Sequence, residues 1–253
     1  MSHPNRFYVA FDDDPEERII LPREEAHHAL RVARLKAGEI ISVFNGRGRV
    51  LSGPLGVSGR HEVWMDIEER DLVPPPPITL TVAQAGLQQD KALMEVLRRA
   101  VEMGVSRLYF WQADHGQKPL SLQERWFKSA VEACKQCGRF YVPEIKIFPS
   151  LEALLTAVDG PGLIGLPDAD QHLPLSLELT DTLTLLIGPE GDFSSREKEL
   201  AQAAGMTPVS LGPYIYRSET ASQFLMTRVV DRLGWLGPPL TLRRPAAEAE
   251  SSE

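Results

Sequence analysis

Residues 185–194 read LLIGPEGDFS, an apolar run that leads into two glycines, a proline and a glutamate. The apolar run predicts a buried strand, and a serine followed three residues later by a glutamate predicts a capped helix over residues 195–204. Gly188 and Gly191 allow the backbone to approach a ligand closely, and Glu190 can accept hydrogen bonds from an amine, a hydroxyl or a base edge. The lysine and spacing of a P-loop are missing, which argues against a phosphate ligand. A tight strand-to-helix turn without any ligand explains these residues about equally well.

A second stretch of the same kind, residues 209–221, reads VSLGPYIYRSETA. An expected strand ends at Gly-Pro, and a short irregular segment then brings Arg217 and Glu219 to the start of an expected helix. Either Ser218 or Thr220 can cap that helix, so the hydroxyls need no further role. Arg217 is different, because a cation directly before a helix N-terminus faces the positive end of the helix dipole. This unfavourable placement predicts a functional arginine.

Around these two stretches, strand-like apolar runs alternate with helical periodicities. The alternation predicts a mostly parallel α/β sheet covered by helices on both faces, with ligand sites beyond the carboxyl ends of the strands. The expected strands cover residues 78–85, 108–111, 145–148, 163–166, 183–187 and 208–211. The expected helices cover 90–103, 121–137, 151–158, 195–204 and 219–233, and the second of them opens with a capping box from Ser121 to Glu124.

Four consecutive prolines at 74–77 mark the clearest boundary in the chain, because they cannot continue a helix or a central strand. Before them come short β-rich runs, a helical pattern over residues 23–35 and an Asn45-Gly46 hairpin signal, which together predict a small β-barrel. Its expected strands cover 6–11, 18–21, 39–44, 48–51 and 62–68. The sequence therefore divides into a β-barrel domain at 1–72, an α/β domain at 78–236 and a disordered tail at 237–253.

The composition is that of an ordinary soluble protein. Apolar residues make up 43% and charged residues 25% of the 253 residues, and neither a membrane-length apolar run nor a signal-peptide core is visible. Two cysteines cannot build a disulfide framework, so a reducing cytoplasm is the expected compartment. The net charge of −8 argues against a nucleic-acid partner, but residues 23–60 hold seven basic side chains against three acidic ones. RNA binding requires only a basic face, and a solvated mixed-charge surface explains the same residues.

Several motifs together resemble one family. IGPEG at 187–191, followed by LGP at 211–213 and RSETA at 217–221, is similar to the RsmE family of the SPOUT superfamily. HALRV at 28–32 and VFNGRG at 43–48 are similar to the N-terminal PUA-like barrel of that family. KALME at 91–95 with AVEMGV at 100–105, and the stretch 124–143, are similar to helices of its catalytic domain. The resemblance covers almost the whole chain before the tail, in the right order.

The resemblance implies methylation of N3 of a specific uridine in 16S ribosomal RNA, with S-adenosylmethionine (SAM) as the methyl donor. It also implies a trefoil-knotted sheet, a homodimer acting on the small ribosomal subunit, and no metal. Arg217 is the expected catalytic cation, with Glu190 or Glu219 orienting it or taking the proton. The residues expected to hold SAM are Leu166, Ile187, Gly188, Gly191, Ser210, Leu211, Gly212, Ile215 and Tyr216. Those expected to contact RNA are Arg6, Arg31, Arg47 and Arg139.

The chain departs from the family pattern at a few positions. Asp192 replaces a usual glycine, Tyr214 and Tyr216 stand where arginine and leucine are usual, and residues 114–116 differ from the expected serine-containing loop. Two alternatives therefore stay open. One is a SPOUT methyltransferase that acts on a different RNA nucleotide or atom. The other is a non-catalytic RNA-binding or ribosome assembly protein that has kept the fold.

Two further features of the sequence have simpler interpretations. Cys134 and Cys137 resemble half of a zinc site whose other half is missing, and both share an expected helical face with Trp126, which favours packing in the core. His27 and His28 have no acidic partners at metal-ligand spacing. A surface or RNA-facing role is therefore favoured for them over a metal site.

Overall fold

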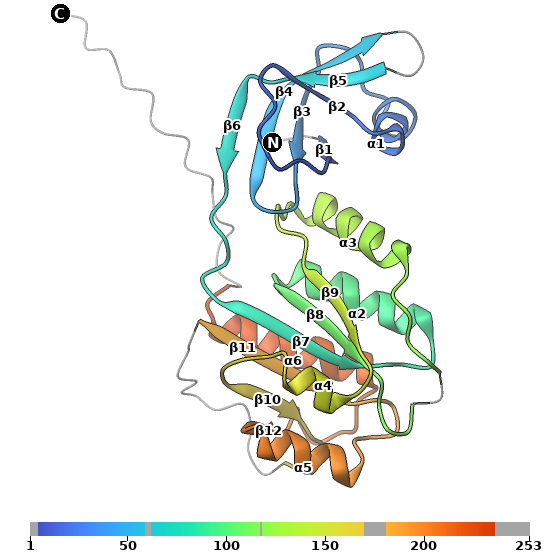
Figure 1. Cartoon of the computed structure of the whole chain (residues 1–253), viewed down its shortest axis with the longest axis vertical. Coiled ribbons are helices and arrows are strands. Elements are labelled where there is room, and N and C mark those ends of the chain that lie inside the picture. Colours follow the sequence, from blue (N-terminus) through green and yellow to red (C-terminus); the bar gives the residue numbers. More distant parts are fainter. Residues whose placement is uncertain (1–4, 59–61, 117, 170–180, 236–253) are drawn as a thin grey trace, which may run out of the picture.

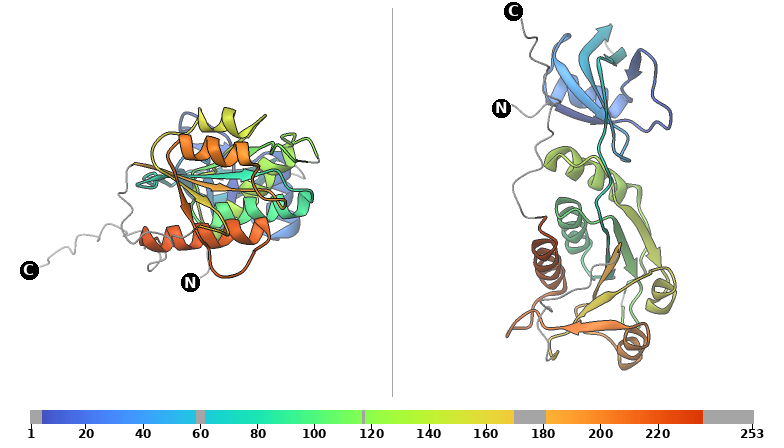
Figure 2. Two further views of the ribbon diagram at one scale, coloured as in Figure 1. Left: turned by 90° about the horizontal axis from the view of Figure 1, so that it is seen from below. Right: turned by 90° about the vertical axis from the view of Figure 1, so that its left-hand side faces the viewer.

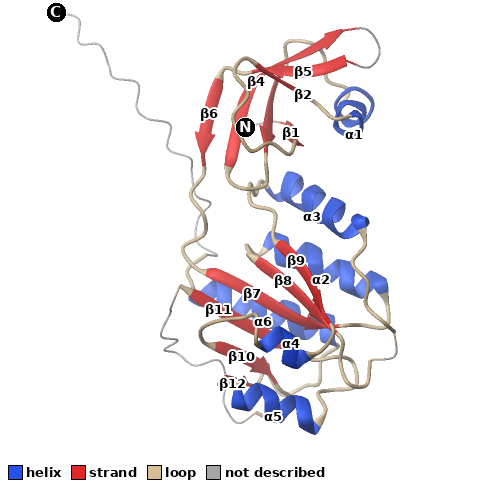
Figure 3. Cartoon of the chain, in the orientation of Figure 1, coloured by secondary structure: helices blue, strands red, loops and turns tan. Residues whose placement is uncertain are grey.

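The computed structural model describes residues 5–58, 62–116, 118–169 and 181–235, and each of its two parts is built on its own six-stranded sheet (Figure 1). The β-rich part lies at one end of an elongated molecule and the α/β part at the other, as the colouring by secondary structure makes plain (Figure 3). The expected disordered tail at 237–253 lies outside the described residues. No helix of the described part is long and apolar enough to cross a bilayer.

The N-terminal part is a strongly bent sheet in the order β1-β3-β4-β5-β2, with β6 paired to β4. A helical segment closes one side of it, where α1 (Arg23–His27) continues into the π-helical turn η1 (His28–Val32). Phe7, Ile41, Leu51 and Met65 lie at the centre of its own apolar core. The strands are β1 (Asn5–Tyr8), β2 (Arg18–Ile20), β3 (Ile40–Phe44), β4 (Arg49–Ser58), β5 (Glu62–Asp66) and β6 (Glu69–Leu72).

Three of the expected strands in this part were wrong in length, and the first of them, expected at 6–11, ends at Tyr8. The run expected at 48–51 extends to Ser58. Its two later glycines lie where neighbouring residues approach the backbone closely. A Cβ on Gly53 would lie 1.9 Å from the carbonyl oxygen of Asp66, and one on Gly56 would lie 2.1 Å from the Trp64 ring. The run expected at 62–68 is two strands, β5 and β6. The chain turns between them, where the Ile67 amide donates to Glu17 and not to the β4 ladder.

The C-terminal part is a six-stranded sheet in the order β12-β10-β11-β7-β8-β9, and every neighbouring pair is parallel. This confirms the α/β class expected from the alternating pattern. The strands are β7 (Thr79–Ala85), β8 (Arg107–Trp111), β9 (Glu144–Phe148), β10 (Gly162–Gly165), β11 (Thr182–Ile187) and β12 (Met206–Val209). The helices are α2 (Asp90–Glu102), α3 (Glu124–Cys137), α4 (Leu151–Leu155), α5 (Ser195–Ala203) and α6 (Ser218–Arg232).

The helices form a layer on each face of this sheet (Figure 2). α2 packs against both α3 and α6 on one face, and α4 packs against α5 on the other. Each layer has its own apolar core, with Leu97, Leu108 and Met226 in the first and Trp111, Leu154 and Leu186 in the second. The path between β10 and β11 runs through residues 170–180, which are outside the described residues, so the knot stays a prediction.

Two expected helix caps were wrong. α3 begins at Glu124 after Gln123, whose extended backbone makes no side-chain cap, so the expected box from Ser121 to Glu124 does not form. α6 begins one residue early, and Arg217 is its N-cap residue with no side-chain cap from Ser218 or Thr220. The hydroxyl of Ser218 is instead bonded to the loop after β11. The capping box of α5 is confirmed, since Ser194 and Glu197 bond each other's backbone amides.

The cysteine prediction is confirmed for one residue and wrong for the other. Cys134 is fully buried in α3, and burial raises the pKa of its thiol to about 12. Cys137 is exposed, because it lies at the last turn of α3, where Gly138 takes a left-handed conformation and ends the helix.

The hairpin turn of the N-terminal part is bonded to the α/β part. The amide of Gly48 donates to the carbonyl of Phe140, and the amide of Val142 donates to the carbonyl of Gly46. Gly48 has a φ of +90°, and a Cβ there would lie 2.3 Å from the hydroxyl of Tyr141, so this position requires glycine. Phe44 and Val50 pack in the same apolar cluster as residues of the parallel sheet. The two parts therefore share packed surface as well as the chain that connects them.

A buried ion cluster forms a second contact between the two parts. Lys135 on α3 has a side chain only 7% exposed, and its Nζ lies 3.1 Å from the carboxylate of Glu25 and 2.8 Å from that of Glu132. Nζ also lies 3.3 Å from Nδ1 of His28 and over the ring of Phe7. The cluster joins α1 and η1 to α3, which fixes the barrel against the α/β part.

His28 should make the stability of this interface depend on pH. Burial, and then the charge of Lys135, lower the pKa of His28 from its ordinary 6.5, so the folded chain favours the neutral ring. The contribution of neutral His28 to the free energy of unfolding is therefore fully present above about pH 6.5 and is lost as the pH falls below it. We expect His28→Gln to flatten the change of the urea midpoint between about pH 7.5 and 5.5. His27→Gln, at the exposed neighbour, is the control and should behave as wild type; equal slopes in all three proteins would contradict the assignment.

Candidate functional site

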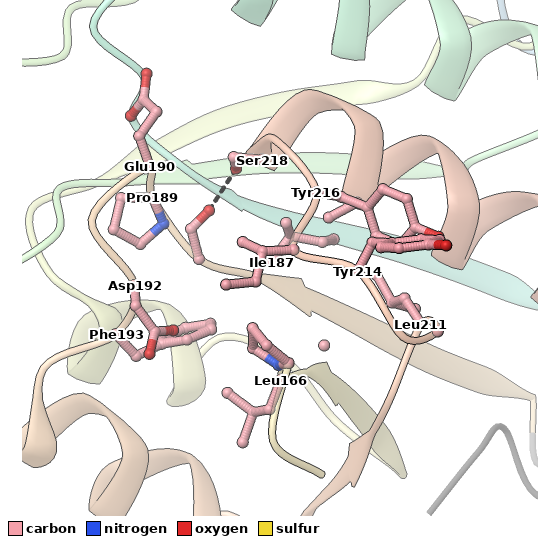
Figure 4. A pocket seen from close by; sticks show the side chains of 16 residues that line it. Leu166, Ile187, Pro189, Glu190, Asp192, Phe193, Leu211, Tyr214, Tyr216 and Ser218 are labelled. Carbon is pink, nitrogen blue, oxygen red and sulfur yellow. Dashed lines mark hydrogen bonds between the residues drawn. The ribbon is translucent and has the colours of Figure 1, made fainter.

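One pocket lies at the carboxyl edge of the parallel sheet, where three neighbouring strands end (Figure 4). Its walls come from the segment after β10, the loop between β11 and α5, and the loop between β12 and α6. Seven of the nine residues expected to hold a cofactor line it, namely Leu166, Ile187, Gly188, Leu211, Gly212, Ile215 and Tyr216. Gly191 and Ser210 are not among the lining residues, and the hydroxyl of Ser210 instead bonds within its own turn to Gly212. The cofactor role of all nine stays a prediction.

The loop after β11 rests on a buried aromatic side chain. A Cβ on Gly188 would lie 2.7 Å from the ring of Phe193, so this position has no room for a side chain. Phe193 in turn stacks on Trp111, with ring centroids 5.9 Å apart and planes 16° apart. The first glycine of the stretch thus has a packing reason that is independent of any ligand. Phe193 is a pocket residue that the sequence did not single out.

Hydrogen bonds from two neighbouring loops hold this loop in place. Oε1 of Glu190 accepts from the backbone amide of Gln88, in the turn between β7 and α2. On the other side Glu197, which is 1% exposed, accepts from the amides of Asp114 and Ser194. The hydroxyl of Ser194 donates to the carboxylate of Asp114. Asp114, in the segment that departs from the family pattern, therefore has a structural role here.

Asp192 occupies a position that favours glycine. Its φ is +66°, in the left-handed region, and its carboxylate is paired with Lys198 at 2.8 Å. This backbone explains why a glycine is usual at this place, since aspartate tolerates the left-handed region better than most residues with a Cβ. The ion pair keeps the added charge on the turn.

We expect the effect of substitutions at position 192 on protein stability to depend on the left-handed backbone there. Asp192→Gly should leave the free energy of unfolding nearly unchanged, because the relieved strain offsets the lost ion pair. Asp192→Ala should lower it by about 1 kcal/mol, because alanine keeps the strain and has no side chain to bond locally. Urea unfolding of the three proteins measures the order, and an alanine variant as stable as the glycine variant would disprove the explanation.

The loop after β12 carries exposed apolar and aromatic residues. Tyr214 is 74% exposed and Ile215 is 87% exposed, although both line the pocket. Tyr216 stacks on Phe224 of α6, with ring centroids 4.8 Å apart and planes 23° apart. The two tyrosines thus present aromatic surface where the family pattern has a cation and an aliphatic residue.

Arg217 lies directly after this loop, on the surface, as the N-cap residue of α6. Within the described chain, its guanidinium has no hydrogen bond or ion pair. Glu219 follows in the first turn of the helix, half-buried. The expected catalytic residues Arg217 and Glu219 are therefore next to the pocket, and Glu190 lies across it on the opposing loop (Figure 4). Their catalytic roles stay predictions.

The four arginines expected to contact RNA are in different environments. Arg6 donates to the carbonyl of Lys135, and Arg139 donates to the carbonyl of Val101, where burial lowers its pKa. Both are engaged inside the protein, which does not favour a role in RNA binding. Arg47 is paired with Asp12 on the surface, and Arg31 is exposed on η1. The structure therefore leaves Arg31 as the best placed of the four.

Comparison with known proteins gives consistent matches. A family model described as an RNA methyltransferase domain matches residues 74–230, and one described as an RNA methyltransferase PUA domain matches residues 21–63. Ribosomal RNA small subunit methyltransferase E of Rickettsia conorii is 28% identical over 228 residues, which is 86% of this chain and 91% of the relative. Its counterpart in Buchnera aphidicola is 25% identical over 240 residues, covering 90% and 94%.

Solved structures resemble the whole molecule. A Legionella pneumophila protein described as a methyltransferase, solved with bound SAM, superposes with a TM-score of 0.81 at 25% identity, over 92% of this chain and 98% of that one. A Porphyromonas gingivalis protein described as an rRNA methyltransferase also gives a TM-score of 0.81, at 28% identity, over 91% and 99%. Both matches include the barrel and the parallel sheet together.

Proposed function

Because the chain belongs to the RNA methyltransferase family, with a PUA domain before the catalytic domain, we propose that it methylates N3 of a specific uridine in 16S ribosomal RNA. The observation that carries the proposal is the pocket at the ends of β10, β11 and β12, with Arg217 beside it, whose guanidinium has no partner among the described residues. Ligands of parallel α/β sheets bind at this edge. The named relatives act on small-subunit ribosomal RNA, which supplies the substrate class.

SAM fits the character of this pocket. Leu166, Ile187, Leu211 and Ile215 give it apolar walls that suit an adenine ring, while Gly188 and Gly212 bring bare backbone to its surface. We assign the adenine to the apolar walls and its polar edge to the backbone of the two glycine loops. SAM bound here supplies an electrophilic methyl group on a sulfonium. Titration of the protein with SAM, in the absence of RNA and metal, is expected to show binding.

The chemistry assigned to this chain's own residues begins with the uridine. N3 is normally paired, so the base must be unstacked and presented edge-on before it can react. As N3 loses its proton, negative charge grows on the pyrimidine carbonyls, and a cation aimed at them stabilises the anion. Arg217 is the cation we assign to this task. Its exposed position at the pocket and its several N–H donors suit a pyrimidine carbonyl oxygen that gains negative charge.

The two candidate acids have different surroundings, which favours different roles. One oxygen of Glu190 is already engaged by the amide of Gln88, so we assign Glu190 to holding its loop. Glu219 lies one turn or less from Arg217, and no bond to its carboxylate is found in the described part of the chain. We therefore assign Glu219 to receiving the N3 proton, directly or through water.

The proposal includes a homodimer that acts on the small ribosomal subunit in the cytoplasm. Ile215 and Phe224 expose 87% and 42% of their surface beside the pocket, which favours a second subunit as cover. Arg31 and the basic excess around it favour the barrel as an RNA-contacting domain. Sedimentation should then give about twice the chain mass of 28.1 kDa, and a monomer at micromolar concentration would contradict this part.

A second candidate function keeps the enzyme and changes the target nucleotide or atom. The observation that favours it is the aromatic surface of Tyr214 and Tyr216, where the resembled family usually has arginine and leucine. An altered wall beside the reacting base can alter which base is accepted. The two functions differ in the position of the product methyl group.

The experiment that tests the proposal maps the methylated nucleotide. Small subunits and bare 16S ribosomal RNA from a strain without the enzyme are incubated with the protein and methyl-labelled SAM. A methyl on N3 blocks base pairing, so reverse transcription should stop at one uridine, and mass spectrometry of the digest should identify 3-methyluridine. Label on another nucleotide or atom would support the second function, and the absence of label would overturn both.

A further inference from the structure

A buried hydrogen-bond chain runs beneath the pocket from the central strand of the sheet. Gln84 on β7 is completely buried, and its Nε2 donates to the hydroxyl of Ser218 at 2.9 Å and to the carbonyl of Ala85 at 3.1 Å. The hydroxyl of Ser218 donates in turn to the carbonyl of Gly188 at 2.5 Å, the bond dashed in Figure 4. Strand β7, the loop after β11 and helix α6 are thus joined at one hydroxyl.

This chain of hydrogen bonds connects the two loops that border the pocket, the one after β11 and the one before α6. Gly188 opens the loop that carries Glu190, and Ser218 follows Arg217 directly in the sequence. Four residues after Gln84, the backbone amide of Gln88 donates to Glu190 in the loop that Gly188 opens. The segment 84–88 therefore sets where the glycine loop lies relative to the start of α6.

Stability alone does not account for an amide at position 84. Its Oε1 is buried and has no hydrogen-bond partner within the described part of the chain. An unsatisfied buried acceptor is unfavourable, and an apolar side chain of the same length would avoid it. The hydroxyl of Ser218 has a single proton, which it donates to the carbonyl of Gly188, so its oxygen can only accept from residue 84, and the amide of Gln84 donates to one of its lone pairs. By donating to the hydroxyl oxygen of Ser218, the amide of Gln84 fixes the direction in which that hydroxyl points its own proton.

We propose that Gln84 is a positioning residue for methyl transfer, which acts through Ser218 to hold Arg217 at a set distance from the Gly188–Glu190 loop. The inference rests on the proposed function. Gln84 touches neither substrate in this assignment, and its effect is on the geometry in which the reaction occurs. Loss of the amide lets the hydroxyl of Ser218 rotate away from Gly188, and the two loops then separate by small amounts.

Four variants of the full-length protein test the proposal: Gln84→Met, Ser218→Ala, the double variant, and Ser222→Ala as the matched control. Ser222 is also buried on α6, one turn beyond Ser218, and its hydroxyl has no partner in the described chain. Turnover is measured at saturating SAM and RNA, beside SAM affinity and melting temperature. Gln84→Met should lower kcat about tenfold, the effect of one misplaced hydrogen bond, with SAM affinity within about threefold and no lower melting temperature.

The double variant separates positioning from independent structural effects. If Gln84 acts through Ser218, the double variant should be about as slow as Ser218→Ala alone, because the second substitution removes nothing further. Ser222→Ala should have wild-type turnover. A near-normal kcat for Gln84→Met, or single effects that multiply in the double variant, would overturn the inference.

Two further outcomes remain decisive. Should Gln84→Met fail to fold, the comparison of Ser218→Ala with Ser218→Thr takes its place, since threonine keeps the hydroxyl and is expected to keep turnover within about threefold. Equal losses in both would overturn the inference. Should the wild-type protein itself transfer no methyl group to ribosomal RNA in the same assay, the proposed function fails and this inference falls with it.

Discussion

Arg217→Ala is expected to lower methyl transfer to ribosomal RNA by about 100-fold or more, the scale seen when a charge-stabilising donor is lost. Arg217 is exposed at the N-terminus of α6 beside the pocket, where a cation is disfavoured by the helix dipole and has no acidic partner in the described chain. In the proposed mechanism it interacts with the uridine anion more strongly than with the neutral base. Its removal should therefore affect kcat more than substrate affinity.

The controls follow from the position of the side chain. The fold should survive, because the guanidinium has no bond to the described chain, and SAM affinity should change little. Arg217→Lys should restore turnover only in part, because a point charge does not reproduce the planar fork of donors. Single-turnover transfer measured beside SAM titration separates these effects. Near-normal transfer by the alanine variant would contradict the role of Arg217 and leave Glu219 as the catalytic candidate.

Lys135→Ala is expected to lower the free energy of unfolding by about 3 kcal/mol or more at neutral pH, the cost of leaving a buried charge without its partner. Glu25, whose side chain is 12% exposed, lies against Lys135, and burial raises the pKa of Glu25 from its ordinary 4.5 even with that ammonium beside it. Among the described residues, Lys135 is the cation paired with this carboxylate, so its removal leaves the carboxylate without an ion pair. Because protonation removes the buried charge and the pKa of Glu25 is raised, the loss should shrink as the pH falls, beginning above 4.5.

Two comparisons test this explanation. Lys128→Ala, on the same helix, removes an exposed ammonium that pairs with Glu24 and Glu124, and it should change stability little. The double variant Lys135→Met with Glu25→Leu removes both charges of the buried pair and should recover most of the stability. Urea unfolding of the full chain gives these values. A lysine variant as stable as wild type would show that the interface does not depend on the cluster.

The parallel sheet could be predicted closely from the sequence because its strands are continuous apolar runs between helical patterns. All six expected strands of this sheet form, and the glycines after Ile187 and Leu211 correctly indicate the edge that carries the pocket. Local signals were also sufficient for α2, which ends where Gly104 takes a φ of +81°. These features depend on neighbours in the sequence, which a pattern can show.

Features that depend on distant residues could not be predicted. The length of β4 is allowed by the approach of Asp66 to Gly53, and the missing cap of α6 follows from the bond of Ser218 to Gly188, thirty residues away. In the same way the RNA assignments of Arg6 and Arg139 did not anticipate their bonds to backbone carbonyls of α3 and α2. Gln84 carries no local signal, because a buried glutamine inside an apolar strand gives no indication of its partner 134 residues later.

The central place of β7 has a consequence for how the protein is made. β7 is the first strand of the α/β part to leave the ribosome. Because Thr79 pairs with Thr182, one edge of β7 stays unpaired until about 100 further residues have been synthesised. At synthesis rates of about 5–20 residues per second, that edge stays open for about 5 to 20 seconds in the nascent chain. The barrel can fold during this interval, while β7 with β8 presents an open apolar edge that other chains can pair with. Slow elongation before residue 182, or shortage of a chaperone that covers such edges, should therefore reduce the yield of the enzyme without any change in its sequence.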